Sequence, residues 1–250
     1  RRVLTKHLQR QPSGCRSRSW FGAVKAFGGS SLDDAAPRFV APAACLVGVA
    51  IAVRVFHVDL RAHGCWSEAP LASWLFVSSA AFALLMFVAV VHTDPGKLPP
   101  ETRGADAIIE ELARALDGGA PDDELPDASR LCPTTWLMKG LRVKYCEAVG
   151  GCVEEYDHFC SLVSAPIGRN NHRQFVLLLC SDLLAQLSHM FLLWKGGGAP
   201  ISLAAIPRWI GSRLGLIFVA HVITAGVVVV ACIDHLRMIA INITSGEVEN

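Results

Sequence analysis

The segment from Cys152 to Phe175 places an acid, an imidazole and a thiol close together, as Asp157, His158 and Cys160. The thiolate is the reactive form of cysteine, and a neighbouring histidine that takes the proton produces it at neutral pH. An aspartate beside the histidine can hold the imidazole in one tautomer and stabilise its charged form. The same residue types also ligate metals, so the pattern fits either a nucleophilic cysteine or part of a metal site.

The elements that must position these residues are apolar. The chain of 250 residues is 52% hydrophobic and 18% charged, with a mean hydropathy of +0.39, which is typical of a membrane-embedded protein. Windows at about 39–58, 71–92, 175–194 and 214–233 approach the roughly 20 apolar residues that a helix needs to cross a bilayer. The alternative is a large soluble helical core, which is disfavoured because these windows lack a charged face.

Lysine and arginine gather on one side of the predicted membrane. They are frequent before the first window and between the second and third, whereas the other two connections hold few, among them Arg61, Lys195 and Arg208. The positive-inside rule therefore places the N-terminal segment, the central loop and the C-terminus in the cytosol. We predict an all-α membrane protein with four transmembrane helices and a cytosolic, cysteine-rich loop between the second and third.

The predicted organisation follows from these windows. A basic cytosolic segment occupies 1–38, the first two transmembrane helices 39–92, the cytosolic loop 93–174, the last two helices 175–236, and a second cytosolic segment 237–250. No apolar stretch of signal-peptide length precedes the first window, so no cleaved secretory signal is expected. The net charge of +1 hides the charge asymmetry and says little about partners.

The central loop also contains the cysteines Cys132, Cys146 and Cys152. Disulfides are rare in the cytosol, so metal binding or thiol chemistry is the better interpretation of these residues. In order and spacing, the cysteines and the Asp-His-Phe-Cys segment at 157–160 resemble the cysteine-rich domain of the DHHC protein S-acyltransferases (palmitoyltransferases).

Two flanking motifs agree with this resemblance. The sequence TDPG at 93–96, directly after the second window, resembles the family's DPG motif, and NITSGEVEN at 242–250 resembles its TTxE motif. The residues that carry these two motifs are Asp94, Pro95, Gly96, Thr244, Ser245 and Glu247. The motifs occur in the family's order relative to the four windows, so the resemblance covers about residues 39–250.

The resemblance implies a catalytic function for the opening residues. Cys160 would receive a long acyl chain from palmitoyl-CoA, with His158 as its base and Asp157 as the residue that orients the imidazole. The acyl group would then pass to membrane-proximal cysteines of substrate proteins at the bilayer surface, and no nucleic acid is involved. The family's usual location is the endoplasmic reticulum or Golgi, and Ser245 keeps a hydroxyl that could bond Asp157. The alternative for His158 is a purely structural role.

Basic residues near the predicted catalytic segment could contact the phosphates of CoA. They could equally well face anionic lipid headgroups at the cytosolic surface. These residues are Arg142, Lys144, Arg169, His172 and Arg173.

The family's domain holds two zinc ions, each with three Cys and one His, and this sequence departs from that pattern. The mapped sites are Cys132, Thr135, Tyr145 and Cys152 for the first ion, and Cys146, Val149, Phe159 and Pro166 for the second. A structural zinc needs four N or S donors, so the residual cysteines Cys132, Cys146 and Cys152 are not expected to bind zinc tightly. We expect apolar packing to replace part of the metal's contribution to folding.

These departures leave a second function open, a catalytically inactive membrane scaffold or acyl-binding pseudoenzyme. The lost zinc positions favour it, as do Ser161 and Leu162 in place of the family's Pro-Trp. Against it, the Asp, first His and Cys of the motif are kept, and Phe159 replaces only a zinc ligand. Some ankyrin-repeat members of the family carry an aromatic residue there too. A channel or transporter has little support, since the windows show no repeats.

Polar residues recur at helical spacing in the third window, as Asp182, Gln186 and His189, and so share one face of the predicted helix. Ionisable residues inside a membrane usually face the bundle interior. Asp182 and His189 could pair across that face and hold helices together, or the face could line a cavity.

Overall fold

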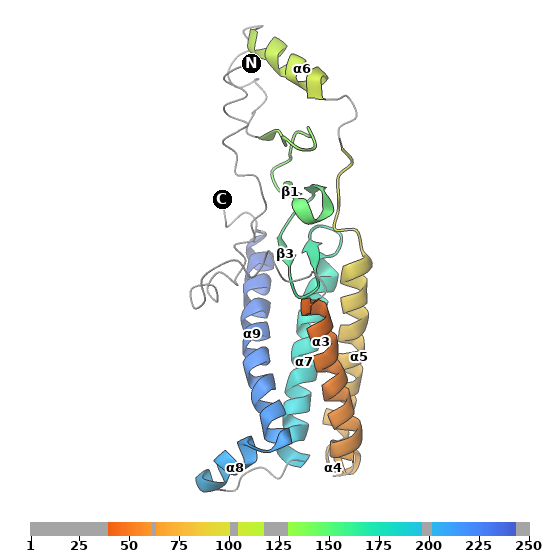
Figure 1. Cartoon of the computed structure of the whole chain (residues 1–250), viewed down its shortest axis with the longest axis vertical. Helices are drawn as coiled ribbons and strands as arrows, with labels where there is room; N and C mark the ends of the chain where they lie inside the picture. Colours follow the sequence, from red (N-terminus) through yellow and green to blue (C-terminus); the bar gives the residue numbers. More distant parts are fainter. Residues whose placement is uncertain (1–39, 62–63, 101–104, 118–129, 197–201, 244–250) are drawn as a thin grey trace.

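The computed structural model describes residues 40–61, 64–100, 105–117, 130–196 and 202–243. Long helices run side by side, and a region of loops and short strands lies on one end of them (Figure 1). The helices α3 (Val40–Val55), α5 (Pro70–His92), α7 (His172–Gly196) and α9 (Arg213–Ile241) form the bundle. Shorter helices are α4 (Cys65–Glu68), α6 (Ala105–Asp117) and α8 (Ile206–Ile210), with a 3-10 turn at Leu203–Ala205.

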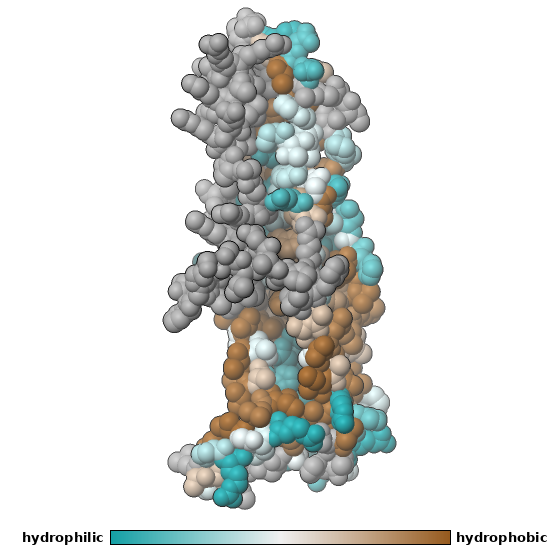
Figure 2. Space-filling view, in the orientation of Figure 1, coloured by the Kyte–Doolittle hydropathy of each residue, from teal (hydrophilic) through white to brown (hydrophobic). Residues whose placement is uncertain are grey.

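The helices α5, α7 and α9 are long and apolar enough to cross a membrane, as predicted from the second, third and fourth windows. Many of their apolar side chains face outward, and Figure 2 shows these as a hydrophobic surface over the bundle. The first window forms α3, a shorter apolar helix that continues into a π-helical turn, η1 (Phe56–Leu60). The chain is therefore an integral membrane protein by composition, and the fourth span stays a prediction.

The bundle is built around α7, which packs against α5 on one side and α9 on the other. At the end away from the strands, η1 joins this packing through a hydrophobic cluster that contains Leu60, Phe76, Leu192 and Leu193. At the opposite end, α5 finishes, α7 begins and α9 finishes close to the short strands (Figure 1). Between helices in a membrane, close packing of such side chains rather than their removal from water favours association.

The polar face predicted on α7 joins it to α9. Gln186 donates to Asp182 on the same helix at 2.6 Å and accepts from the Thr224 hydroxyl of α9 at 2.7 Å. One turn further along, Nδ1 of His189 lies 2.8 Å from Nε2 of His221 on α9. The predicted pairing of Asp182 with His189 is wrong, because each side chain has a nearer partner. The two hydrogen bonds between α7 and α9 support the alternative in which this polar face holds helices together.

The central loop, predicted to be cytosolic, contains two antiparallel hairpins, which the all-α prediction did not include. Strand β1 (Lys144–Cys146) pairs with β2 (Gly151–Val153) through a 3-10 turn, η3 (Glu147–Val149), and β3 (His158–Cys160) pairs with β4 (Ala165–Ile167). Residues with positive φ angles make the turns, Gly150 at 58° and Ser164 at 50°. Strands of three residues are too short to show an alternating pattern in the sequence.

The DPG segment connects α5 to this loop. The carboxylate of Asp94 accepts hydrogen bonds from the backbone of Gly96 and Lys97, both at 2.8 Å, and Gly96 adopts a φ of 101° that favours glycine. The carbonyl of Gly96 accepts from the amide of Glu154 at 2.9 Å. A Cβ on Gly168 would lie 2.5 Å from the Pro95 carbonyl oxygen, so close packing fixes this junction.

The ends of the predicted segments differ in detail from the helices. Helix α7 begins at His172, before the predicted boundary at 175, and α9 continues to Ile241, beyond the predicted boundary at 236. The TTxE-like residues Thr244, Ser245 and Glu247 lie outside the described residues.

Candidate active site

Hairpin β3–β4 positions the predicted catalytic residues. His158 lies opposite Ile167 and Cys160 opposite Ala165, while the amide of Asp157 donates to the carbonyl of Ile167 at 2.9 Å. Successive side chains of a strand point to opposite faces, so His158 and Cys160 share one face. The predicted acid, base and thiol are thus held together by a backbone ladder.

The imidazole of His158 is oriented by Asp157. Its Nδ1 atom lies 3.0 Å from Oδ2 of Asp157, whose side chain is only 2% exposed. Burial alone would lower the pKa of His158, but its hydrogen bonds to Asp157 and Cys160 raise that pKa to about 9. Because Nδ1 faces the carboxylate, Nε2 is left for the thiol. This is the acid, imidazole and nucleophile order of a hydrolase triad.

Cys160 lies where three long helices meet. The thiol is buried in a hydrophobic cluster with Val90 at the end of α5, Phe175 and Leu179 on α7, and Cys232 on α9. The aromatic ring of Phe175 also packs edge-on against His158, with ring centroids 5.2 Å apart. The thiol therefore faces the apolar interior of the bundle, while the hairpin that carries it lies at the end of the bundle.

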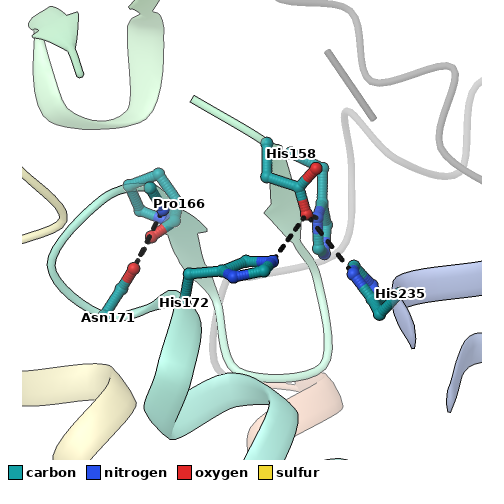
Figure 3. A network of polar contacts seen from close by, with 7 residues as sticks. His158, Pro166, Asn171, His172 and His235 are labelled. Atoms are coloured by element: carbon teal, nitrogen blue, oxygen red, sulfur yellow. Dashed lines mark hydrogen bonds and ion pairs between the residues drawn. The ribbon is translucent and has the colours of Figure 1, made fainter. Parts of the chain in front are cut away.

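Two further histidines approach the same carboxylate, as Figure 3 shows. Nδ1 of His235, near the end of α9, lies 3.6 Å from Oδ2 of Asp157, and Nε2 of His172, at the start of α7, lies 3.8 Å from it. His172 was predicted only as a phosphate contact. His235 was missed, although an ionisable residue in an apolar helix is itself a signal of function.

Asn171 fixes the turn between β4 and α7. Its Oδ1 accepts from the amide of Gly168 at 2.9 Å, and its Nδ2 donates to the carbonyl of Pro166 at 2.9 Å (Figure 3). The side chain is fully buried. It holds the second strand of the catalytic hairpin against the first turn of α7, which carries His172.

The first mapped zinc site brings two thiols and a hydroxyl together. The Thr135 hydroxyl lies 3.3 Å from Sγ of Cys152, and Tyr145 lies opposite Cys152 in the β1–β2 ladder. Burial would raise the pKa of Cys132, but hydrogen bonds to Thr135 and Cys152 lower it; burial and the neighbouring Cys132 raise the pKa of Cys152 to about 11. Two sulfur donors and neutral oxygens do not make the four N or S donors of a structural zinc site.

The second mapped zinc site is filled by apolar packing. Cys146 is buried against Val153 and Tyr156, and Val149 and Phe159 pack on the same cluster. Pro166 lies opposite Phe159 in the β3–β4 ladder. These residues supply one sulfur donor, which is fewer than the family's zinc ion requires, and replacement of the ion by apolar packing stays a prediction.

The basic residues predicted to contact CoA have varied surroundings. Arg142 donates to the side-chain oxygen of Asn242 at 3.3 Å and so joins the loop to the end of α9. Arg169 pairs with Glu154 at 2.6 Å, and this pair raises the pKa of the guanidinium. Lys144 lies on β1, and Arg173 is exposed in the first turn of α7.

Comparison with known proteins finds palmitoyltransferases among the similar sequences. The chain is 32% identical over 116 residues to Palmitoyltransferase AKR1 of Lachancea kluyveri, covering 46% of this chain and 15% of that protein. It is 26% identical over 208 residues to Palmitoyltransferase ZDHHC12 of Homo sapiens, covering 80% of this chain and 72% of that protein. The matched region spans less than a fifth of the AKR1 relatives' length.

The family model of the DHHC palmitoyltransferases matches residues 126–250, which is half of the chain. The match begins before Cys132 and extends through the catalytic hairpin, α7 and α9. It includes both mapped zinc positions as well as Asp157, His158 and Cys160. The chain therefore belongs to the DHHC palmitoyltransferase family.

Proposed function

We propose that this chain is an active protein S-acyltransferase that carries a long acyl chain, such as palmitoyl, on Cys160. The observation that carries the proposal is the 3.0 Å contact between Asp157 and His158, with His158 on the same strand and strand face as the buried thiol of Cys160. A positioned base of this kind contributes roughly a hundred- to ten-thousandfold in rate.

The first step is acyl transfer from palmitoyl-CoA. The neutral form of His158 takes the thiol proton, the Cys160 sulfur attacks the thioester carbonyl, and the C–S bond to CoA breaks as the proton returns to the leaving sulfur. In the second step a cysteine thiol of a substrate protein attacks the acyl-Cys160 thioester, and His158 moves the proton from the incoming to the departing sulfur. Asp157 stabilises the imidazolium in both steps.

The position of Cys160 suits an apolar acyl chain. Its neighbours Val90, Leu179 and Cys232 come from three helices of the bundle and lead from the hairpin toward the membrane interior. A chain placed along them would remain out of water, at about 0.8 kcal/mol for each buried methylene. The acyl acceptor would be a membrane-proximal cysteine of a substrate protein, because the nucleophile lies at the end of the bundle.

The topology proposed with this function has four spans, including α3 and η1, and the catalytic loop in the cytosol of an endomembrane, the endoplasmic reticulum or Golgi. The lysine and arginine distribution supports the orientation. The exposed Arg173 and the Lys144 side chain are proposed to meet CoA phosphates, together with Arg142 and Arg169, whose present partners a phosphate would compete with.

We further infer that the cysteine-rich loop does not depend on tightly bound zinc. Cys146, Val149 and Phe159 form an apolar cluster at the second mapped zinc site. At the first mapped site, Cys132 and Cys152 supply only two of the four N or S donors that a structural zinc needs. The same departures favour the second candidate function, an inactive scaffold or acyl-binding pseudoenzyme. Retention of an oriented acid, base and thiol favours the enzyme.

The proposal is tested by incubating purified protein with a clickable palmitoyl-CoA analogue and measuring hydroxylamine-sensitive label. Wild-type protein is expected to take up label, Cys160→Ser to take up none, and Cys146→Ser, which changes a buried cysteine of the same loop, to keep it. Absence of label in folded wild-type protein would support the scaffold instead.

A further inference from the structure

A carboxylate and three imidazoles converge from three separate elements at the catalytic hairpin (Figure 3). Around Oδ2 of Asp157, Nδ1 of His158 lies at 3.0 Å, Nδ1 of His235 at 3.6 Å and Nε2 of His172 at 3.8 Å. Catalysis by an acid, base and thiol uses only Asp157 and His158. It gives no reason for the other two rings to approach the same oxygen.

His235 gives an independent sign that this site binds a ligand. Its side chain is 9% exposed, and its Nδ1 atom has no hydrogen-bond partner among the described residues although it points toward Asp157. A buried polar atom without a partner costs about 1–3 kcal/mol. Such atoms in folded proteins commonly mark a bound water or ion.

The spacing of the donor atoms fits a tetrahedral metal ion. With Zn–N and Zn–O bonds of about 2.0–2.1 Å, neighbouring donors of a tetrahedron lie about 3.3 Å apart. The three distances to Oδ2 of Asp157 are between 3.0 and 3.8 Å, and the donor atoms of Asp157, His158 and His235 all lie within 4.8 Å of one another. Small side-chain movements would therefore bring these three donors onto one ion, and a further movement of His172, whose Nε2 lies 3.8 Å from Oδ2 of Asp157, would add the fourth.

The donor set and its surroundings favour zinc among the divalent ions. Imidazole nitrogen suits zinc, whereas calcium and magnesium prefer oxygen ligands in larger number. The ring of Phe175 packs against both His158 and His235, with centroids 5.2 and 5.1 Å away, and so limits their movement. His172 is 31% exposed and gives an ion a path from solvent.

We propose that Asp157, His158, His172 and His235 form a binding site for Zn²⁺, whose occupation silences the neighbouring thiol. The site is separate from the cysteine positions that correspond to the family's structural zinc ions. Zinc binds Nδ1 of the neutral His158 ring, whose single proton then resides on Nε2; a protonated ring first releases its second proton to solvent. Nε2 then donates a hydrogen bond and cannot accept the proton of Cys160.

The inhibitory consequence rests on the proposed acyltransferase function, whereas binding of the ion does not. Binding is measured with Co²⁺ as a spectroscopic substitute for zinc, added to purified protein that has been dialysed against EDTA. Visible d–d bands report nitrogen and oxygen ligation, and a thiolate charge-transfer band would report binding at the loop cysteines instead. Zinc inhibition is measured in parallel through the rate of autoacylation, with reversal by EDTA.

The variants are His235→Gln and His172→Gln, which remove one ligand each from different helices. The matched control is His92→Gln, which changes an exposed histidine at the same end of the bundle. We expect wild type and His92→Gln to bind one Co²⁺ per chain without a thiolate band, and each ligand variant to lose at least about tenfold in affinity.

Two results would overturn the zinc site: failure of wild-type protein to bind Co²⁺, or Co²⁺ affinities in both ligand variants equal to that of wild type. A thiolate band as the main signal would also overturn it, by placing the ion on cysteines. If Co²⁺ binds as expected but metal-free protein takes up no acyl label, the zinc site stands and the acyltransferase function fails. If label forms but zinc does not slow it, the site's inhibitory role fails.

Discussion

Nδ1 of His158 lies 3.0 Å from the buried carboxylate of Asp157, and this contact determines which ring nitrogen is available to Cys160. Both residues are fixed by the β3–β4 ladder, since Asp157 bonds the backbone of Ile167 and His158 lies opposite it. The proposed base is therefore positioned before any substrate binds. Because both side chains are held in place by the fold, substitutions at Asp157 and at His158 can test the role of each residue by itself.

Replacement of the proposed base, His158, should lower the rate of autoacylation more than it lowers the stability of the fold. We expect His158→Ala to slow autoacylation by roughly a hundredfold or more, because a general base acts in the transition state. Asp157→Asn should lie between wild type and His158→Ala, since the imidazole remains but loses its charged partner. Rates normalised to the monodisperse fraction from size-exclusion chromatography test this. Wild-type rates in both variants would favour the pseudoenzyme.

The pH dependence of stability reports the protonation of His158. Its pKa in the folded protein is about 9, above the ordinary value of 6.5, so protonation stabilises the fold fully below pH 6.5. That contribution is lost as the pH rises from 6.5 to 9. In EDTA-containing buffer, the difference in melting temperature between wild type and His158→Gln should narrow over this interval. A difference that stays constant or widens would show that His158 is not protonated in the folded state.

The junction between the DPG segment and the catalytic hairpin should tolerate no side chain at Gly168. A Cβ there would lie 2.5 Å from the Pro95 carbonyl oxygen and 2.6 Å from Cγ1 of Val153. We expect Gly168→Ala to lower the free energy of unfolding by about 1–3 kcal/mol.

Gly226→Ala is the matched control for this substitution, because a Cβ on Gly226 of α9 meets no heavy atom within 4 Å. Alanine is the better helix former, by about 1 kcal/mol, so this variant should be at least as stable as wild type. Denaturation in detergent measures both variants. Equal stability of Gly168→Ala and Gly226→Ala would contradict the close packing of Pro95 on Gly168.

The apolar cluster of Cys146, Val149 and Phe159 predicts that the loop folds without structural zinc. After dialysis against EDTA, elemental analysis should find well under one zinc per chain, and the melting temperature should be unchanged. Two zinc ions retained through dialysis would contradict the mapped ligand positions. Loss of zinc accompanied by unfolding would show that the apolar cluster does not replace the metal.

The long helices and the catalytic segment could be predicted from local sequence. Continuous apolar windows specify α5, α7 and α9, and Asp157, His158 and Cys160 are neighbours in the chain. The hairpins could not be predicted in the same way, since three-residue strands such as β3 depend on pairing rather than on periodicity.

His235 shows why the complete site was beyond sequence reasoning. It lies far from Asp157 in the chain, and only the packing of α9 on α7 brings its ring to the carboxylate. Likewise, Gln186 bonds Asp182 on its own helix and Thr224 on α9, whereas Asp182 and His189 do not pair with each other. The register of the two helices decides which polar side chains meet. Helix register is a tertiary property that one sequence does not display.

The most direct test of the central claim is identification of the acylated residue. Metal-free wild-type protein is allowed a single turnover with palmitoyl-CoA, digested at low pH to preserve thioesters, and analysed by mass spectrometry. The account predicts one acylated peptide, carrying palmitoyl on Cys160, that is absent when His158→Ala is sampled at the same early time. Acylation of Cys132, Cys146 or Cys152 with Cys160 unmodified would contradict it.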